Sequence, residues 1–285
     1  MVDSLSKEEQ KQHLINKIGN NVEIQELYSR IYRCEDCKDC TNPIGVHYFV
    51  NGNGNPSSSN YLPITIPVAN FGDVINAKVW VVVTNPAGDR VDPLVGLSVK
   101  SFKVNSRSQL NDEAIKKIFD FQCNYFKHGK DRWHPFFFTF YHLLNGIKIG
   151  NEPISFEAGD VCFVDAIKCP TQKAWMGYVM TAEGKRVWDN CLRKKNKFLE
   201  KQLLLHKPEL VLYWGTSGLI KAKIRGKKAG ESSSFSKKLK LTTRHVYSEG
   251  KLNQISIDFT NTKFNSLPRR EQMEVRNYIS NSITI

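Results

Sequence analysis

Three short, largely apolar segments separated by helical sequence constrain the fold of this 285-residue chain most strongly. They read VWVVV at 79–83, within a strand predicted over 78–83, CFVDAIKC at 162–169 and ELVLYWG at 209–215. Apolar runs of this length are typical of strands that are buried on both faces of a parallel sheet. The sequence therefore predicts an α/β fold with three layers, α/β/α, around a central and mostly parallel sheet of four strands.

The other segments complete this expected architecture. A fourth strand is predicted at 238–247, and helices are predicted at 6–33, 112–126, 135–147, 183–206 and 269–283. We expect a helical segment at 1–33 and a single domain at 34–285, with a helical insertion around 100–150 and a basic loop at 221–240. Aromatic residues of the insertion could line a pocket or could belong to a covering helix; they include Trp133, His134, Phe136 and Tyr141.

The charge of the chain favours a polyanionic partner. The formal net charge is +13 and the isoelectric point is about 9.4. One basic cluster, at 221–240, includes Lys227 and Lys228, and nucleic acid is the commonest partner of such a surface. The sequence contains no run of eighteen apolar residues, so no membrane span is predicted. The charged N-terminus has no apolar signal core. We therefore expect a cytoplasmic, monomeric protein.

Polar or small residues lie at the ends of the predicted strands. Asn85 follows the first strand, Asp165 lies in the second, Gly215 ends the third and His245 lies near the end of the fourth. Ligands of open parallel sheets bind beyond the carboxyl ends of the strands. We expect these four residues to gather at one edge of the sheet.

Four motifs occur in a defined order along the chain. They are CKDC (37–40) followed by GNGNP, TNPAGDRVDPLVG from residue 84, DAIKCP from residue 165, and KPELVLYWGTSG from residue 207 with His245 after it. This order resembles the uracil-DNA glycosylase superfamily, particularly its iron–sulfur branch. That branch typically shows CxxC, GEGNP, GEAPG with PFVG, TNxVKC, a KPxVIxxLG strand and a late His-Pro. The resemblance covers residues 34–280.

The resemblance implies the ligands of a [4Fe–4S] cluster. They would be Cys37, Cys40, Cys169 and Cys191. A CxxC followed by two separated cysteines also suits tetrahedral zinc, and free buried thiols are a further alternative. Cys34 is a rival ligand.

The resemblance also implies catalytic roles. Asn85 resembles the Asn of the GINPG motif in the mismatch-specific members, whereas the iron–sulfur branch usually has Ala there. It would orient water against the anomeric carbon, which suffices if the glycosidic bond breaks first and leaves an oxocarbenium-like sugar. Alternatively, Asn85 and Pro86 form an ordinary turn. His245 would donate to a carbonyl oxygen of the leaving base, although the family's His-Pro is His-Val here. Arg244 and Tyr247 would contact the DNA.

The predicted base-binding residues are Asp165, Leu94 and Pro86. The family has Asn in place of Asp165 and Phe in place of Leu94. A carboxylate accepts from an exocyclic amine, which cytosine has and uracil lacks, and a leucine opens space. Alternatively, Asp165 caps the next element or pairs with Lys168.

The resemblance therefore implies a monofunctional DNA glycosylase that flips out a modified pyrimidine and hydrolyses its glycosidic bond. A cytosine-derived base is favoured, such as the glucosylated hydroxymethylcytosine of phage DNA. One alternative is a uracil-DNA glycosylase of base-excision repair. Another is a non-catalytic iron–sulfur protein that binds DNA or senses damage. Water is the expected nucleophile, and Lys168 ranks below it as a Schiff-base former.

Overall fold

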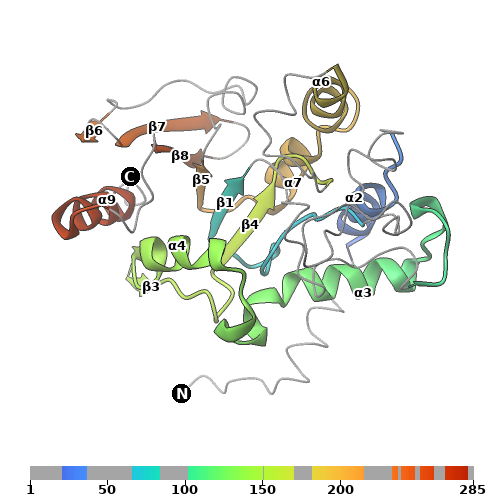
Figure 1. The fold of residues 1–285 in the computed structure, drawn as a ribbon, viewed down its shortest axis with the longest axis horizontal. Coiled ribbons are helices and arrows are strands. Elements are labelled where there is room, and N and C mark those ends of the chain that lie inside the picture. The colour runs from blue at the N-terminus through green and yellow to red at the C-terminus, as the bar shows by residue number, and fades with distance from the viewer. Residues whose placement is uncertain are drawn as a thin grey trace, which may run out of the picture.

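A mixed α/β arrangement is found in the computed structural model, as the apolar segments predict (Figure 1). The residues that it describes are 21–36, 66–83, 102–149, 151–169, 182–214, 233–236, 239–247, 251–259 and 267–281. Their strands form a six-stranded sheet in the order β4-β1-β5-β8-β7-β6, and a ribbon of β2 (Lys148–Ile149) and β3 (Glu152–Pro153).

The first three predicted strands form a parallel sheet. β1 (Val79–Val83) pairs in parallel with β4 (Val161–Asp165) on one side and with β5 (Leu210–Trp214) on the other. β8 (Lys251–Phe259) pairs in parallel with β5. These pairings confirm the parallel β4-β1-β5 arrangement.

The sheet continues in the opposite sense beyond β8. β7 (Leu239–Tyr247), the fourth predicted strand, is antiparallel to β8, and β6 (Ser233–Ser236) is antiparallel to β7. Among the described residues the sheet therefore has six strands, where four were predicted. β6 also places a strand inside the segment predicted as a basic loop.

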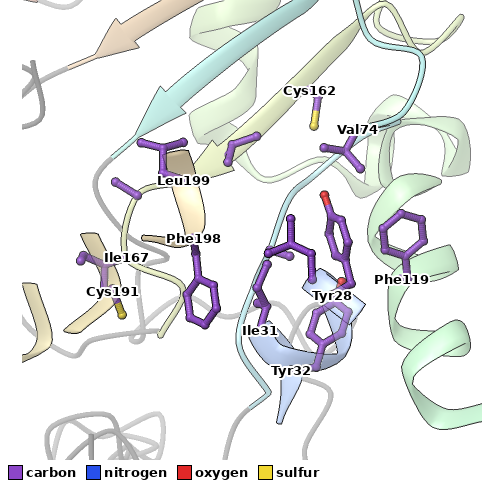
Figure 2. Packing of buried hydrophobic residues seen from close by; sticks show 14 of the residues in the cluster. Tyr28, Ile31, Tyr32, Val74, Phe119, Cys162, Ile167, Cys191, Phe198 and Leu199 are labelled. Atoms are coloured by element: carbon purple, nitrogen blue, oxygen red, sulfur yellow. The ribbon is translucent and has the colours of Figure 1, made fainter. Parts of the chain in front are cut away.

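One face of the parallel strands packs against three helices that lie far apart in the sequence. Trp80, Val82, Cys162, Val164 and Tyr213 lie in this core, with side chains of α2 (Val22–Tyr32), α3 (Asp112–Cys123) and α7 (Phe198–His206). Figure 2 shows part of this cluster, in which the Tyr28 and Phe119 rings meet edge to face at 4.4 Å.

The opposite face packs against α4 (Pro135–Leu144) and α9 (Arg269–Asn281). Trp133 is buried there, and its ring centroid lies 5.1 Å from that of Phe126. The ring centroids of Phe137 and of Phe163 in β4 are 4.7 Å apart. The insertion therefore contributes a covering helix and an aromatic core. These contacts do not support the alternative in which its aromatic residues line a pocket.

The helix predicted over 183–206 is wrong in its middle. The structure has α6 (Ala182–Trp188), a π-helical turn at Asp189–Arg193, and then α7. Lys197, just before α7, has a left-handed backbone with φ 49°. This break separates the two helices, and the wider turn carries Cys191, which is buried in the core.

A segment at 66–71 lies alongside β4 and limits the sheet at that side. Phe71 and Phe163 exchange both main-chain hydrogen bonds at 2.8 Å, in an antiparallel bridge. Gly72 then turns the chain with φ 98°, where a β-carbon would lie 2.6 Å from the Val161 carbonyl oxygen. Only glycine meets both demands without strain.

In the part of the chain that the structure describes, no helix has the length and apolar character needed to cross a membrane.

Candidate functional site

Asp165 lies where the two central parallel strands end. It is the last residue of β4 and is paired in register with Val83, the last residue of β1. The amide of Ala166 donates to the Val83 carbonyl oxygen at 2.8 Å, which holds the two strand ends together. The chain continues from Val83 directly into Thr84, Asn85 and Pro86. Those residues and Leu94 lie outside the described residues, so their positions stay predictions.

The Asp165 carboxyl group is buried without full hydrogen bonding. Its side chain is 1% exposed, and Oδ2 has no hydrogen-bond partner among the described residues. Burial raises the pKa of this carboxyl to about 7, against the attraction of Lys168, which lowers it. A buried polar atom without a partner costs about 1–3 kcal/mol, which makes Oδ2 a strong candidate for a ligand contact.

Lys168 holds the turn that follows Asp165. Its Nζ donates to the main-chain oxygens of Asp165 at 2.5 Å and Ala69 at 3.2 Å, and to Gln202 Oε1 at 2.5 Å. An ammonium group has three donors, so these three acceptors use all of them. Burial lowers the pKa of Lys168 to about 8, while Asp165 raises it. The three acceptors favour the charged form, which is unsuited to Schiff-base chemistry.

The hydrogen bonds continue from Lys168 into the core. Gln202 Nε2 donates to the Tyr28 hydroxyl at 3.1 Å, and that hydroxyl lies 3.2 Å from His206 Nε2. Burial lowers the pKa of His206 to about 4, so the ring is neutral at neutral pH. α2 and α7 thereby fix Lys168, and Lys168 fixes the main chain at Asp165.

The elements that carry the predicted metal ligands converge on the same side of the sheet. Cys169 and Cys191 are both buried in the core cluster that also contacts Cys34. Asn190, next to Cys191, donates to the main-chain oxygen of Asp36 at 3.2 Å, and Asp36 directly precedes Cys37. These contacts bring three of the predicted ligand segments together.

The other two predicted ligands, Cys37 and Cys40, lie outside the described residues. Within the described ranges, no group of three or more His, Cys, Asp or Glu side chains is arranged to hold a metal ion. Cys34 stays a rival, with its sulfur 3.8 Å from Asn196 Nδ2 and 3.9 Å from Asp36 Oδ2. Thiolate sulfur is a ligand that iron–sulfur clusters and zinc both accept, so the cofactor stays a prediction.

Arg107 contacts two of the cysteines, and sequence reasoning did not single it out. It lies in a 3₁₀ turn at Arg107–Gln109 and is fully buried. Its Nη1 donates to the Cys34 carbonyl oxygen at 3.1 Å and to the Cys169 sulfur at 3.6 Å. The segment NSRSQL offers no motif that would have identified it, because its significance depends on contacts distant in sequence.

His245 does not lie at the edge where Asp165 lies. Along the strand pairings, His245 is level with Asn253, Leu210, Val79 and Val161, at the beginnings of the parallel strands. It is therefore about 13 Å from the level of Asp165 along the strands and four strand spacings, about 19 Å, across them. The prediction that His245 joins Asp165 was wrong because β7 runs antiparallel to its neighbour.

Of the predicted DNA-binding residues, the structure describes only the two that lie in β7. Arg244 and Tyr247 also belong to β7, and Tyr247 pairs with Lys251 at the start of β8, again away from Asp165. Lys227, Lys228 and Gly215 lie outside the described residues. The structure therefore brings together the main-chain ends at Val83 and Asp165, and separately the Cys169 and Cys191 segments.

Comparison with known proteins gives no family assignment: no protein-family model matches the chain, and no curated protein matches it.

Proposed function

We propose that this protein is a monofunctional DNA glycosylase that removes a cytosine-derived base, built on a three-layer fold like that of the uracil-DNA glycosylases. The observation that carries the proposal is the buried Asp165 carboxyl, whose Oδ2 has no hydrogen-bond partner among the described residues, at the edge where the sequence continues from β1 into Asn85. The parallel pairing of β8 with β5 supports the proposed central sheet. The net charge of +13 suits a DNA partner.

The proposed reaction begins when the target nucleotide leaves the helix. The ionised Asp165 accepts a hydrogen bond from the exocyclic amine of the base, and Leu94 and Pro86 contact its ring. The bond between the base and C1′ breaks with its electron pair going to the base. Asn85 orients a water molecule, which adds to C1′ and loses a proton to solvent.

The proposed cofactor is a [4Fe–4S] cluster on Cys37, Cys40, Cys169 and Cys191, with zinc as the alternative. The donor–acceptor contact between Asn190 and Asp36 supports this ligand set, because it joins the segments of Cys191 and Cys37. When bound, such a cluster would brace the fold around the site, while base removal itself uses only side chains and water.

The test compares matched duplex oligonucleotides that carry uracil, cytosine, hydroxymethylcytosine or glucosylated hydroxymethylcytosine, with alkaline cleavage at abasic sites. We expect cleavage at a cytosine-derived base, and its loss in Asn85→Ala with unchanged DNA affinity. The exposed Asn105→Ala is the control and should retain activity. Cleavage only at uracil would contradict the base assignment. Normal DNA binding with no base release from any substrate would instead favour the non-catalytic DNA-binding alternative.

A further inference from the structure

A buried guanidinium joins two elements of the cysteine-rich region. Arg107 is 0% exposed, and burying a guanidinium is unfavourable unless strong acceptors compensate for lost water. Two of its acceptors are the Cys34 carbonyl oxygen at 3.1 Å and the Cys169 sulfur at 3.6 Å, both reached from Nη1. The second contact is within hydrogen-bond range for a sulfur acceptor.

The turn that carries Arg107 is itself fixed to the same region. The amide of Ser108 donates to Glu35 Oε1 at 3.0 Å, so main chain and side chain both bind the segment that leads to Cys37. On the other side, the main-chain oxygen of Lys168 accepts from the Val68 amide at 2.8 Å, immediately before Cys169. Arg107 therefore meets a sulfur whose main chain is held in place.

The chemistry of this contact depends on what the sulfur binds. A neutral thiol is a weak acceptor, whereas a metal-bound thiolate carries negative charge and forms a charge-assisted hydrogen bond with an arginine. A guanidinium carries donors and no acceptor, so Arg107 can only donate to this sulfur. A buried arginine donating to Cys169 is therefore better satisfied when Cys169 is a ligand than when it is a free thiol.

We propose that Arg107 is a positioning residue for the metal centre, which orients Cys169 as a ligand and raises the reduction potential of the cluster through an N–H···S hydrogen bond. The inference rests on the cofactor part of the proposed function. Positive charge and hydrogen bonds at the sulfurs stabilise the reduced cluster, which carries one more negative charge. Arg107 supplies both effects at one ligand.

The test uses the full chain purified without oxygen, as wild type, Arg107→Gln, Arg107→Lys and the control Arg270→Gln. Arg270 is an exposed arginine on α9, paired with Glu274. Iron and sulfide content, the decay of visible absorption in air and the reduction potential are measured for each. For Arg107→Gln we expect faster cluster loss and at least a tenfold shift of the reduction equilibrium toward the oxidised form, about 59 mV for one electron. Arg107→Lys should fall between, and Arg270→Gln should match wild type.

A second measurement covers the case in which Arg107→Gln does not fold. Wild-type protein labelled with ¹⁵N-arginine is reduced and examined by pulsed electron paramagnetic resonance, where a weak ¹⁵N coupling to the cluster is expected. Absence of that coupling, or a wild-type potential and stability in a folded Arg107→Gln, would overturn the inference. So would a colourless protein that contains zinc and no iron. Base release from wild-type protein is assayed separately, so failure of the glycosylase proposal is distinguishable from failure of this one.

Discussion

Replacing Asp165 by Asn should remove a pH-dependent cost of burying a carboxylate. In the unfolded chain this group ionises near its ordinary pKa of 3.8, whereas burial raises the pKa to about 7 in the folded protein. The stability that the group contributes is therefore fully present below pH 3.8 and is lost as the pH rises through about 7. The difference is about 3 pKa units, each about 1.36 kcal/mol, or about 4 kcal/mol in total.

The asparagine side chain has nearly the same shape and does not titrate. We therefore expect the unfolding free energy of Asp165→Asn, relative to wild type, to rise by up to about 4 kcal/mol between pH 4 and pH 7.5. Lys168 is the neighbouring charge, and its pKa of about 8 keeps it largely protonated over this range in the wild type. Urea denaturation at four pH values measures the effect. The exposed Glu113→Gln is the control and should show no such trend.

The same variant tests the role of Asp165 in base recognition. An amide both donates and accepts, so Asp165→Asn should favour uracil over a cytosine-derived base. A specific contact to a base discriminates by about 1–3 kcal/mol, which is a change of roughly 5- to 150-fold in the ratio of the two rates. A relative stability that does not change with pH would refute the burial argument. An unchanged substrate ratio in a folded variant would refute the recognition argument.

Four further changes test individual contacts. His206→Gln should make the protein less sensitive to acid, because the stability from the neutral ring is present above pH 6.5 and is lost as the pH falls through about 4, by about 3 kcal/mol, in urea titrations. Lys168→Met should lower the unfolding free energy by about 3 kcal/mol or more, since three buried acceptors lose their donor. Gly72→Ala should destabilise on the order of 2 kcal/mol in thermal melts, and more than Gly146→Ala, whose β-carbon would meet no atom closer than 3.9 Å. His245→Ala should leave base release unchanged in the oligonucleotide assay, and a large loss would contradict the placement of β7.

The parallel core was predictable because its strands are buried on both faces. VWVVV has no polar residue that would suggest a half-exposed strand or an amphipathic helix. β1 occupies those same five positions. The second segment was read too long, since β4 ends at Asp165 and the chain turns there under the hold of Lys168. That contact depends on Gln202, far away in sequence, and no local pattern shows it.

The β7–β8 hairpin was missed although the sequence carries a signal for it. Two nine-residue strands flank Ser248, Glu249 and Gly250, a short polar link with glycine that is typical of hairpins. We instead predicted TTRHVY as the end of the last parallel strand, and this prediction placed His245 at the wrong edge of the sheet. The burial of Arg107 could not be foreseen, because charged residues are seldom buried and its acceptors come from distant segments.

If the proposed glycosylase reaction takes place, the corrected topology changes where a partner for the leaving base should be sought. β8, rather than β7, runs parallel to β5, and its Ile257 is level with Trp214, the last residue of that strand. The carboxyl end of β8, at Phe259, therefore lies at the same edge as Asp165. The chain continues from there as TNTKFNS, which contains amide and ammonium donors at Asn261 and Lys263 but no histidine. A donor from this segment would need no imidazole to stabilise a developing oxyanion, since a protonated lysine or an amide supplies the same hydrogen bond.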